Sequence, residues 1–506
     1  MGTGNTLAGS HPEHRRLSYW MERTLKELDK VRASPEPDAV HDLRVALRRC
    51  RSVAAVMEEV DPDRSWREMN KLGRKLFRQL GDLRDVQVLE DWTKKLGAES
   101  DPVRLQLLAI FEKQETELRE SAMWVAGKFG AKAWKKLERG LQRRARVIPP
   151  DGLAAQCLAL ERLEAAKELH TRALRADKPR PWHELRIGVK RFRYTVESLL
   201  PEKYELWGEH LKRVQDLLGD VHDLDVLADT IVHAAAEESE ETRTSWAERI
   251  ASERHPRIET YRQLTVGKTS LWQEWRMGLP HGETLEAAAL ARLRATARAL
   301  DSNLRRTGQV SRLAMRLYDG LKRAQAAPIF AESHLRKVMR AAARLHGIGS
   351  GLDSNAPQRA ARDFLRKLPA PAGWSEEEWF LLINVVRYHR GEQPDTQQKA
   401  FARLSEADQQ AICAMAGVLR LARALRKCGC QTPVGLRVEK SVDALIVRVP
   451  GLQESEEAAA RLAAGKYLLE RVLQQPLIVQ SATVASRVVE IPRNEEPPAS
   501  AAAASD

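Results

Sequence analysis

A basic pattern that occurs twice constrains the fold of this chain more than any other feature. It occupies residues 41–51 and again residues 183–193, and the two copies agree at every basic position. At about 3.6 residues per turn, the cations of each copy fall on one helical face and the apolar residues on another, which would be buried. The cationic rows are His41, Arg44, Arg48 and Arg51 in the first copy and His183, Arg186, Lys190 and Arg193 in the second. A repeated row of cations predicts a ligand with a row of anions.

A second motif follows each basic helix at nearly the same distance. Residues 80–85 read LGDLRD and residues 218–223 read LGDVHD. The duplication predicts two homologous halves, 14–149 and 150–285, each a helical bundle. An internal pseudo-twofold axis would bring the two basic helices together.

Composition agrees with a basic, helical protein. Lys and Arg number 83 against 70 Asp and Glu, which gives a formal net charge of +13 and suits a protein that meets polyanions. The five cysteines form an odd count, which argues against a disulfide framework and for a reducing compartment, so we expect the cytoplasm. No run approaches the roughly 18 apolar residues of a membrane span. We therefore expect no membrane partner.

The pattern changes after the repeats. Helical periodicity without the basic pattern continues through residues 290–430, where we expect an all-helical domain. Residues 434–438 and 444–449 then predict a hairpin, 454–473 a helix and 477–479 a further strand, so 431–490 is expected to be a small α/β cap. Residues 491–506 are expected to be a disordered tail. The predicted fold class is mainly α, with two pseudo-symmetric helical bundles, an all-helical domain and the cap.

A second basic helix follows the first in each half. Its cations are Lys71, Arg74, Lys75 and Arg78 in the first half and Lys212 and Arg213 in the second. Acidic neighbours dilute the second set, so we expect the N-terminal half to contribute more charge. A histidine in the basic row, with an ordinary pKa of about 6.5, would tighten anion binding on protonation as the pH falls.

The repeated pattern His-x-x-Arg-x-x-x-Arg/Lys-Arg-x-Arg, with the later Leu-Gly-Asp motif, resembles the CHAD domain, the conserved-histidine α-helical domain, over residues 14–285. The resemblance implies two four-helix bundles around a basic channel that binds inorganic polyphosphate without hydrolysing it, and association with polyphosphate granules in the cytoplasm. By matching positions, it implies as ligands the eight residues of the two cationic rows. The six cations of the second basic helices are secondary candidates.

Four helical segments follow one another in order after the repeats, at residues 310–321, 341–349, 386–390 and 419–425. In this order they resemble the HD-like C-terminal region of exopolyphosphatase and guanosine pentaphosphate phosphohydrolases, and the resemblance covers residues 290–485. An HD site holds a divalent metal through an adjacent His-Asp dyad and further ligands. Here the dyad reads His346-Gly347, and a later position that is usually Asp in the family is Arg423. We therefore expect no metal, no cofactor and no catalytic residues, and a region that serves as a scaffold or an auxiliary polyanion-binding domain with Arg387, His389 and Arg390 as candidate contacts.

Two other functions remain open at this point. The alternative to a non-catalytic polyphosphate binder is a metal-dependent polyphosphate or nucleotide phosphohydrolase, which would need a metal centre. Nucleic-acid binding is disfavoured because we expect the basic helices to carry no interleaved exposed aromatics for stacking bases, and they contain no recognised reading motif. The sequence leaves open a homo-oligomer or a complex with a polyphosphate-metabolising enzyme.

Overall fold

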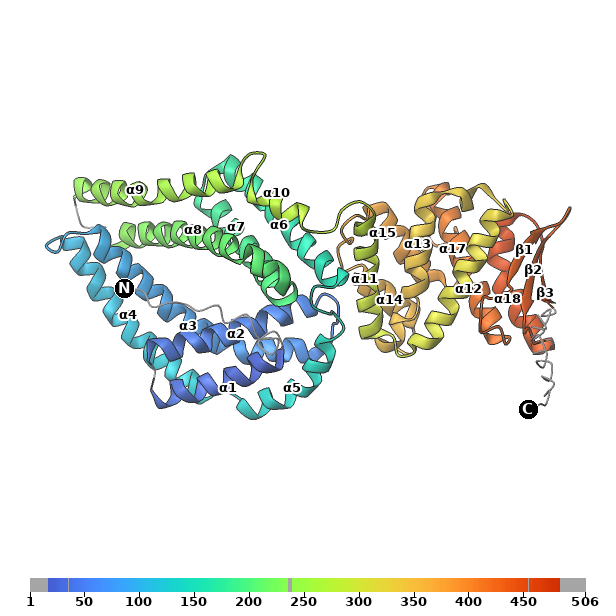
Figure 1. Cartoon of the computed structure of the whole chain (residues 1–506), viewed down its shortest axis with the longest axis horizontal. Helices are drawn as coiled ribbons and strands as arrows, with labels where there is room; N and C mark the ends of the chain where they lie inside the picture. Colours follow the sequence, from blue (N-terminus) through green and yellow to red (C-terminus); the bar gives the residue numbers. More distant parts are fainter. Residues whose placement is uncertain (1–16, 35, 235–238, 454, 483–506) are drawn as a thin grey trace, which may run out of the picture. The chain divides into compact units, whose positions relative to one another are not determined.

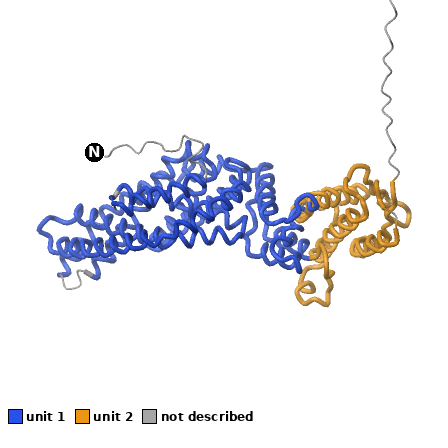
Figure 2. Tube along the Cα trace, turned by 90° about the horizontal axis from the view of Figure 1, so that it is seen from below, with its two compact units in different colours: residues 1–307, 344–387 blue, residues 308–343, 388–506 orange. Residues whose placement is uncertain are grey.

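The computed structural model describes residues 17–34, 36–234, 239–453 and 455–482 of the chain (Figure 1). The expected tail, 491–506, and the start of the expected first half, 14–16, lie outside the described residues. The described part is helical up to residue 427 and ends in a small sheet. It forms two compact units: unit 1 contains the residues up to 307 together with 344–387, and unit 2 contains 308–343 and the residues from 388 (Figure 2).

The first repeat folds into four long helices and a shorter fifth one. These are α1 (Leu17–Ala33), α2 (Pro37–Met57), α3 (Arg64–Leu96), α4 (Pro102–Gly127) and α5 (Ala131–Ala145). Aspartates cap the N-termini of α3 and α4. The Asp63 carboxylate accepts a hydrogen bond from the backbone N–H of Ser65 at the start of α3, and Asp101 caps α4 in the same way. Proline at the start of α2 and α4 fits a first turn, where the missing N–H costs nothing.

The second repeat has the same order of elements. Its helices are α6 (Leu153–Ala176), α7 (Pro179–Leu199), α8 (Pro201–Ala234), α9 (Glu240–Thr265) and the short α10 (Leu271–Met277). The basic helices α2 and α7 are both 21 residues long, and α3 and α8 have 33 and 34 residues. The predicted pair of pseudo-symmetric four-helix bundles is confirmed, with one additional short helix in each half.

The two halves meet through equivalent helices. α2 packs on α7 and α3 on α8, and one apolar core runs through both halves. A second cluster fills the distal ends of α3, α4, α8 and α9, where Trp92 and Trp246 pack together with leucines. Trp66, Trp92 and Trp182 are core residues, because each is at most 9% exposed. The duplication therefore produces a continuous double bundle with the basic helices at its centre.

Further helices complete unit 1 and build unit 2. In unit 1, α11 (Glu283–Leu300) packs on α6, where Arg292 Nη1 lies 3.2 Å from Glu161 Oε1, and η3 (Ile348–Gly351), α14 (Pro357–Leu365) and α15 (Glu376–Tyr388) follow. Unit 2 contains most of α12 (Leu304–Arg323) and of α13 (Ser333–Leu345), together with η2 (Pro328–Ala331), α16 (Lys399–Ala402), α17 (Glu406–Lys427) and α18 (Glu456–Leu473). The expected helical segment 290–430 thus contributes to both compact units.

The sheet of unit 2 has three strands in the order β1 (Arg437–Lys440), β2 (Leu445–Pro450) and β3 (Leu477–Ala482). β1 and β2 form the predicted antiparallel hairpin, with Val438 opposite Val447, and β3 pairs parallel to β2 after the crossover through α18. α18 packs closely on α17, because a Cβ at Gly417 would lie only 3.0 Å from the Leu469 backbone nitrogen. The expected small α/β cap is confirmed.

Two simple properties complete the description. All five cysteines are free thiols. None of the helices in the described ranges has the length and apolar content that crossing a bilayer requires.

Candidate functional site

The basic helices α2 and α7 lie against each other at the centre of unit 1. Their apolar faces are anchored in the core, with Leu43 and Leu185 fully buried. Across the contact, Arg49 Nη2 lies 2.5 Å from Glu197 Oε1, and the Arg48 guanidinium lies 5.2 Å from the ring centroid of Tyr194. The fold thus brings the cationic rows of the two repeats side by side.

A cleft of about 450 Å³ opens beside this contact, and we call it the α2–α7 cleft. Four arginines line it, together with two aromatic rings. The Arg51 guanidinium lies 4.5 Å from the Phe77 ring centroid. Glu59, the one carboxylate of the lining, forms an ion pair with Arg162. The lining residues are Arg48, Arg51, Ser52, Ala55, Val56, Glu59, Phe77, Arg162, Arg191, Tyr194 and Thr195.

Several arginines of the rows keep unused hydrogen-bond donors. The Nε atoms of Arg48, Arg51 and Arg186 are buried and have no hydrogen-bond partner among the described residues. Leaving a buried donor unsatisfied costs about 1–3 kcal/mol, and more for a charged group. An anion that reached these donors would recover that free energy, because a guanidinium binds phosphate oxygens through charge-assisted hydrogen bonds.

A mixed cluster of charges continues the site toward the Leu-Gly-Asp motifs. Arg44 Nη1 donates to the backbone oxygens of Leu80 and Gly81 at 2.5 and 3.2 Å, so α2 is tied to the motif on α3. Asp85 and Asp223 occupy equivalent positions of the two motifs and act on each other electrostatically. We call Arg44, Arg186, Lys190, Asp85 and Asp223 the central cluster.

Burial shifts the pKa values in the central cluster. Burial and the Arg186 charge lower the pKa of Lys190 to about 8, although Asp223 and Asp85 act in the opposite direction. Burial, with repulsion from Asp85 and Asp220, raises the pKa of Asp223 to about 6. Burial also lowers the pKa of Arg44, and Arg48 adds to that effect. The free protein therefore holds its cations in a setting that disfavours their charge, and a polyanion would relieve this.

The second-repeat histidine pairs with a histidine of the adjacent motif. His183 Nδ1 and His222 Nδ1 are 3.2 Å apart. Burial and Arg186 lower the pKa of both rings, that of His222 to about 4. Glu184 opposes the lowering of the His183 pKa but does not outweigh it, so a bound anion would be needed to protonate this pair near neutral pH. His41, by contrast, is exposed near the start of α2.

The other sequence-predicted residues are distributed over three settings. Arg193 is buried, and Glu197 with Tyr204 outweighs burial and raises its pKa, so this arginine is already neutralised within the protein. Arg74 is close enough to Arg51 to lower the pKa of Arg51, second to burial. Lys71 and Lys75 line a separate groove, described below. Exposed positions on α3 and α8 are held by Arg78, Lys212 and Arg213.

Sequence reasoning missed four members of the site. Arg191 stood inside the repeated pattern but off the predicted row, and Arg162 lies on α6, which carries no such pattern. Asp85 and Asp223 were visible as the last residues of the repeated Leu-Gly-Asp motifs. The recurrence of a carboxylate at an equivalent position near two basic helices was the available signal.

The position next to His346 is closed to a carboxylate. A Cβ at Gly347 would collide with the side chains of Asp301 and Thr307. Arg423 Nη1 donates to the His389 backbone oxygen at 3.2 Å. No three side chains of His, Cys, Asp or Glu are grouped as metal ligands within the residues that the structure describes. Arg387 and His389 are 6% and 2% exposed, so burial keeps both from a polymer in solution.

Comparisons with known proteins match two regions of the chain. Residues 17–232 match the family model of the CHAD domain, and residues 292–449 match that of Ppx/GppA phosphatase, domain III. Among solved structures, the chain is similar to the crystal structure of the CHAD domain from the plant Ricinus communis, with 22% identity, a TM-score of 0.35, and coverage of 54% of this chain and 92% of that chain. No curated protein matches the chain.

Proposed function

Since this chain contains a CHAD domain and domain III of the Ppx/GppA phosphatases, we propose that it binds inorganic polyphosphate through α2 and α7 and does not cleave it. The observation that carries the proposal is the set of arginines that faces one cleft from both repeats. Arg48 and Arg51 come from α2, Arg191 from α7 and Arg162 from α6. Inorganic polyphosphate is a linear row of anions, which suits a linear row of cations.

The geometry of the rows fits a phosphate chain better than a single phosphate. Successive turns of a helix place side chains about 5.4 Å apart along its axis, so one extended polymer can touch several cations of α2 at once. The guanidinium group offers a planar pair of donors to each phosphate, and the buried Nε atoms of Arg48, Arg51 and Arg186 supply donors without partners among the described residues. Lys190 adds a point charge near Arg186 on the same helix.

The absence of cleavage is proposed from the position of Gly347. An HD-type metal site needs a carboxylate directly after its histidine, and Asp301 and Thr307 occupy the space that such a side chain would enter. Arg423 brings a positive charge to a position where the related phosphohydrolases usually carry Asp. We therefore assign the Ppx/GppA-like region a scaffold role. The runner-up, a metal-dependent phosphohydrolase, would have to assemble its centre from other residues.

A protein that holds polyphosphate would concentrate where the polymer collects. We accordingly propose that this protein resides in the cytoplasm at polyphosphate granules. Colocalisation of the tagged protein with granules is expected in cells that make polyphosphate, and it should disappear when the cleft arginines are reversed.

The binding proposal is tested by competition. Fluorescein-labelled long-chain polyphosphate is bound to the full chain, and unlabelled polyphosphate or single-stranded DNA is added at equal phosphate concentration and fixed ionic strength. Polyphosphate should displace the probe at about tenfold lower concentration than DNA. If DNA displaced the probe at a lower phosphate concentration than polyphosphate does, the result would contradict the proposal.

A matched pair of variants locates the site. Arg48→Glu with Arg191→Glu reverses one cleft arginine from each repeat, whereas Lys132→Glu with Lys135→Glu makes the same charge change at exposed positions of α5. The first pair should weaken binding at least about fiftyfold and the second less than about threefold. Equal losses in both pairs would mean that net charge alone governs binding.

A further inference from the structure

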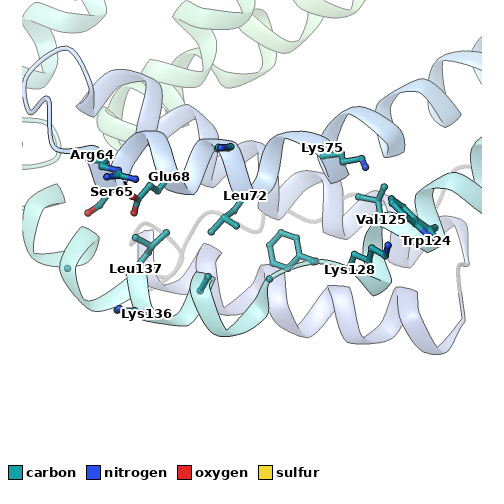
Figure 3. Close-up of a pocket in the computed structure, with 15 residues that line it drawn as sticks. Arg64, Ser65, Glu68, Leu72, Lys75, Trp124, Val125, Lys128, Lys136 and Leu137 are labelled. Atoms are coloured by element: carbon teal, nitrogen blue, oxygen red, sulfur yellow. Dashed lines mark ion pairs between the residues drawn. The ribbon is translucent and has the colours of Figure 1, made fainter.

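A second cavity of unit 1 lies between α3 and α5, and we call it the α3–α5 groove. Its volume is about 800 Å³, and it shares no lining residue with the α2–α7 cleft. Figure 3 shows Leu72 and Leu137 pointing into the groove from opposite sides, with Lys75, Lys128 and Trp124 gathered at one end. The lining residues are Arg64, Ser65, Glu68, Lys71, Leu72, Lys75, Trp124, Val125, Lys128, Phe129, Gly130, Ala133, Lys136, Leu137 and Gly140.

The groove is elongated because it follows two helices. Its lining residues recur every three or four positions from Ser65 to Lys75 on α3 and from Ala133 to Gly140 on α5. At about 1.5 Å per residue, the α3 wall is about 15 Å long, which equals nearly three turns of a helix. A Cβ at Gly140 would meet no atom within 4 Å, so the α5 wall leaves room for close approach.

The floor of the groove is apolar and its rim is basic. Val125 and Phe129 form part of the floor and are largely buried. Four lysines surround it, and none of them forms an ion pair with a carboxylate among the described residues; they are Lys71, Lys75, Lys128 and Lys136. Glu68, the one acidic lining residue, is paired with Arg64 at 2.7 Å.

Trp124 gives the groove an exposed anchor. Its side chain is 54% exposed, which is high for a tryptophan. The ammonium nitrogens of Lys128 and Lys75 lie 3.9 and 4.5 Å from its ring centroid, so the ring holds both cations at the end of the groove. An exposed aromatic ring beside fixed charges is typical of residues that dominate the energy of protein interfaces.

We propose that the α3–α5 groove docks an acidic amphipathic helix of a partner protein. Such a helix presents apolar residues at positions i, i+3, i+4 and i+7, which match the spacing of the apolar floor, and its flanking carboxylates meet the lysine rim. Charge complementarity selects an acidic segment, because no carboxylate in the described part of the chain pairs with the lysines of the rim. A small polar ligand fits less well, since its site would need converging polar groups and this floor offers none.

The test uses a defined probe, a fluorescein-labelled helical peptide of about 16 residues with leucines at those positions and glutamates on the flanks. Fluorescence anisotropy with the full chain should show saturable binding. A peptide of the same composition with scattered leucines should bind at least about tenfold more weakly. Equal binding of the two peptides, or no binding of the first, would overturn the proposal.

Variants separate the groove from the polyphosphate site. Lys128→Glu with Lys136→Glu should weaken peptide binding about tenfold or more, and Ala133→Phe, which fills the groove without changing charge, should do the same. Lys132→Glu with Lys135→Glu should change it less than about threefold. Polyphosphate affinity should fall no further in the groove variants than in this control. Unchanged peptide binding in the groove variants, or polyphosphate loss as severe as in the Arg48 and Arg191 reversals, would contradict a separate docking site.

Discussion

Arg49 on α2 and Glu197 on α7 form an ion pair, 2.5 Å between Nη2 and Oε1, that joins the two repeats beside the cationic rows. Glu197 is 4% exposed, and it also acts on Arg193, whose pKa it helps to raise against the effect of burial. One carboxylate therefore neutralises two arginines at the interface of the halves. Its partners are held in place, whereas Arg48 and Arg51 in the neighbouring cleft are left for a ligand.

Replacing Glu197 by Gln should destabilise unit 1. The substitution leaves Arg49 and Arg193 with uncompensated charge in a largely buried place, which typically costs about 3 kcal/mol. Urea unfolding followed by circular dichroism should show this loss in the free energy of unfolding. As a control, Glu90→Gln removes the partner of the exposed Lys94 and should change the free energy of unfolding much less, because exposed ion pairs contribute little to stability. Comparable losses in the two variants would show that Glu197 has no special role.

Salt should weaken polyphosphate binding, and the salt dependence of the affinity should report how many phosphates the protein contacts. For a polyelectrolyte ligand, the logarithm of the affinity falls linearly with the logarithm of the salt concentration, and each neutralised phosphate adds to the slope. Arg51→Gln should reduce the slope by about 1 and weaken binding at every salt concentration. Titrations at several salt concentrations measure this. A slope that does not change in the variant would place Arg51 outside the contact.

Much of this architecture could be predicted from the sequence because the motifs of unit 1 occur in two copies. The helical period and the duplicated motif predicted the two bundles and the meeting of α2 with α7, since an internal repeat of amphipathic helices buries the same face in both copies. The hairpin and the cap followed from the change of period after residue 430. The short helices α5 and α10 were not predicted, because neither carries the repeated motifs.

The sequence did not predict which cleft or groove each basic side chain would face. The basic row of α3 faces two neighbouring helices, because both α2 and α5 pack against α3. Arg74 therefore comes near Arg51 on α2, whereas Lys71 and Lys75 line the α3–α5 groove. Arg193 matched the pattern, yet Glu197 and Tyr204 engage it. Whether an arginine is neutralised depends on which carboxylate lies near it in the packed structure. The residue pattern of a single helix does not contain that information.

Deprotonation of Lys190 should weaken polyphosphate binding at alkaline pH. Its pKa is lowered to about 8, chiefly by burial and then by Arg186, so the free protein loses this charge as the pH rises through 8. Affinity should therefore fall between pH 7 and pH 9, and binding near pH 8 should take up protons. Calorimetry in buffers of different ionisation enthalpy detects that uptake. In Lys190→Arg the charge persists and the alkaline fall should disappear; if it stays, another group titrates.

Asp223 should give a second step near pH 6. Burial and the repulsion of Asp85 raise its pKa to about 6, so between pH 5 and pH 7 the central cluster gains a negative charge that opposes a polyanion. Affinity should fall over this interval in the native protein. Asp223→Asn should remove the step and bind polyphosphate more tightly at pH 7. Weaker binding by this variant at pH 7 would mean that Asp223 positions a ligand cation instead.

The most direct test of the central claim combines binding with polymer sizing. Long-chain polyphosphate is titrated into the intact protein in a calorimeter, and the polymer length is determined before and after incubation with Mg²⁺ or Mn²⁺. We predict saturable binding with the polymer unshortened. Shortening that a chelator blocks would contradict this account and would make the protein a metal-dependent polyphosphate hydrolase.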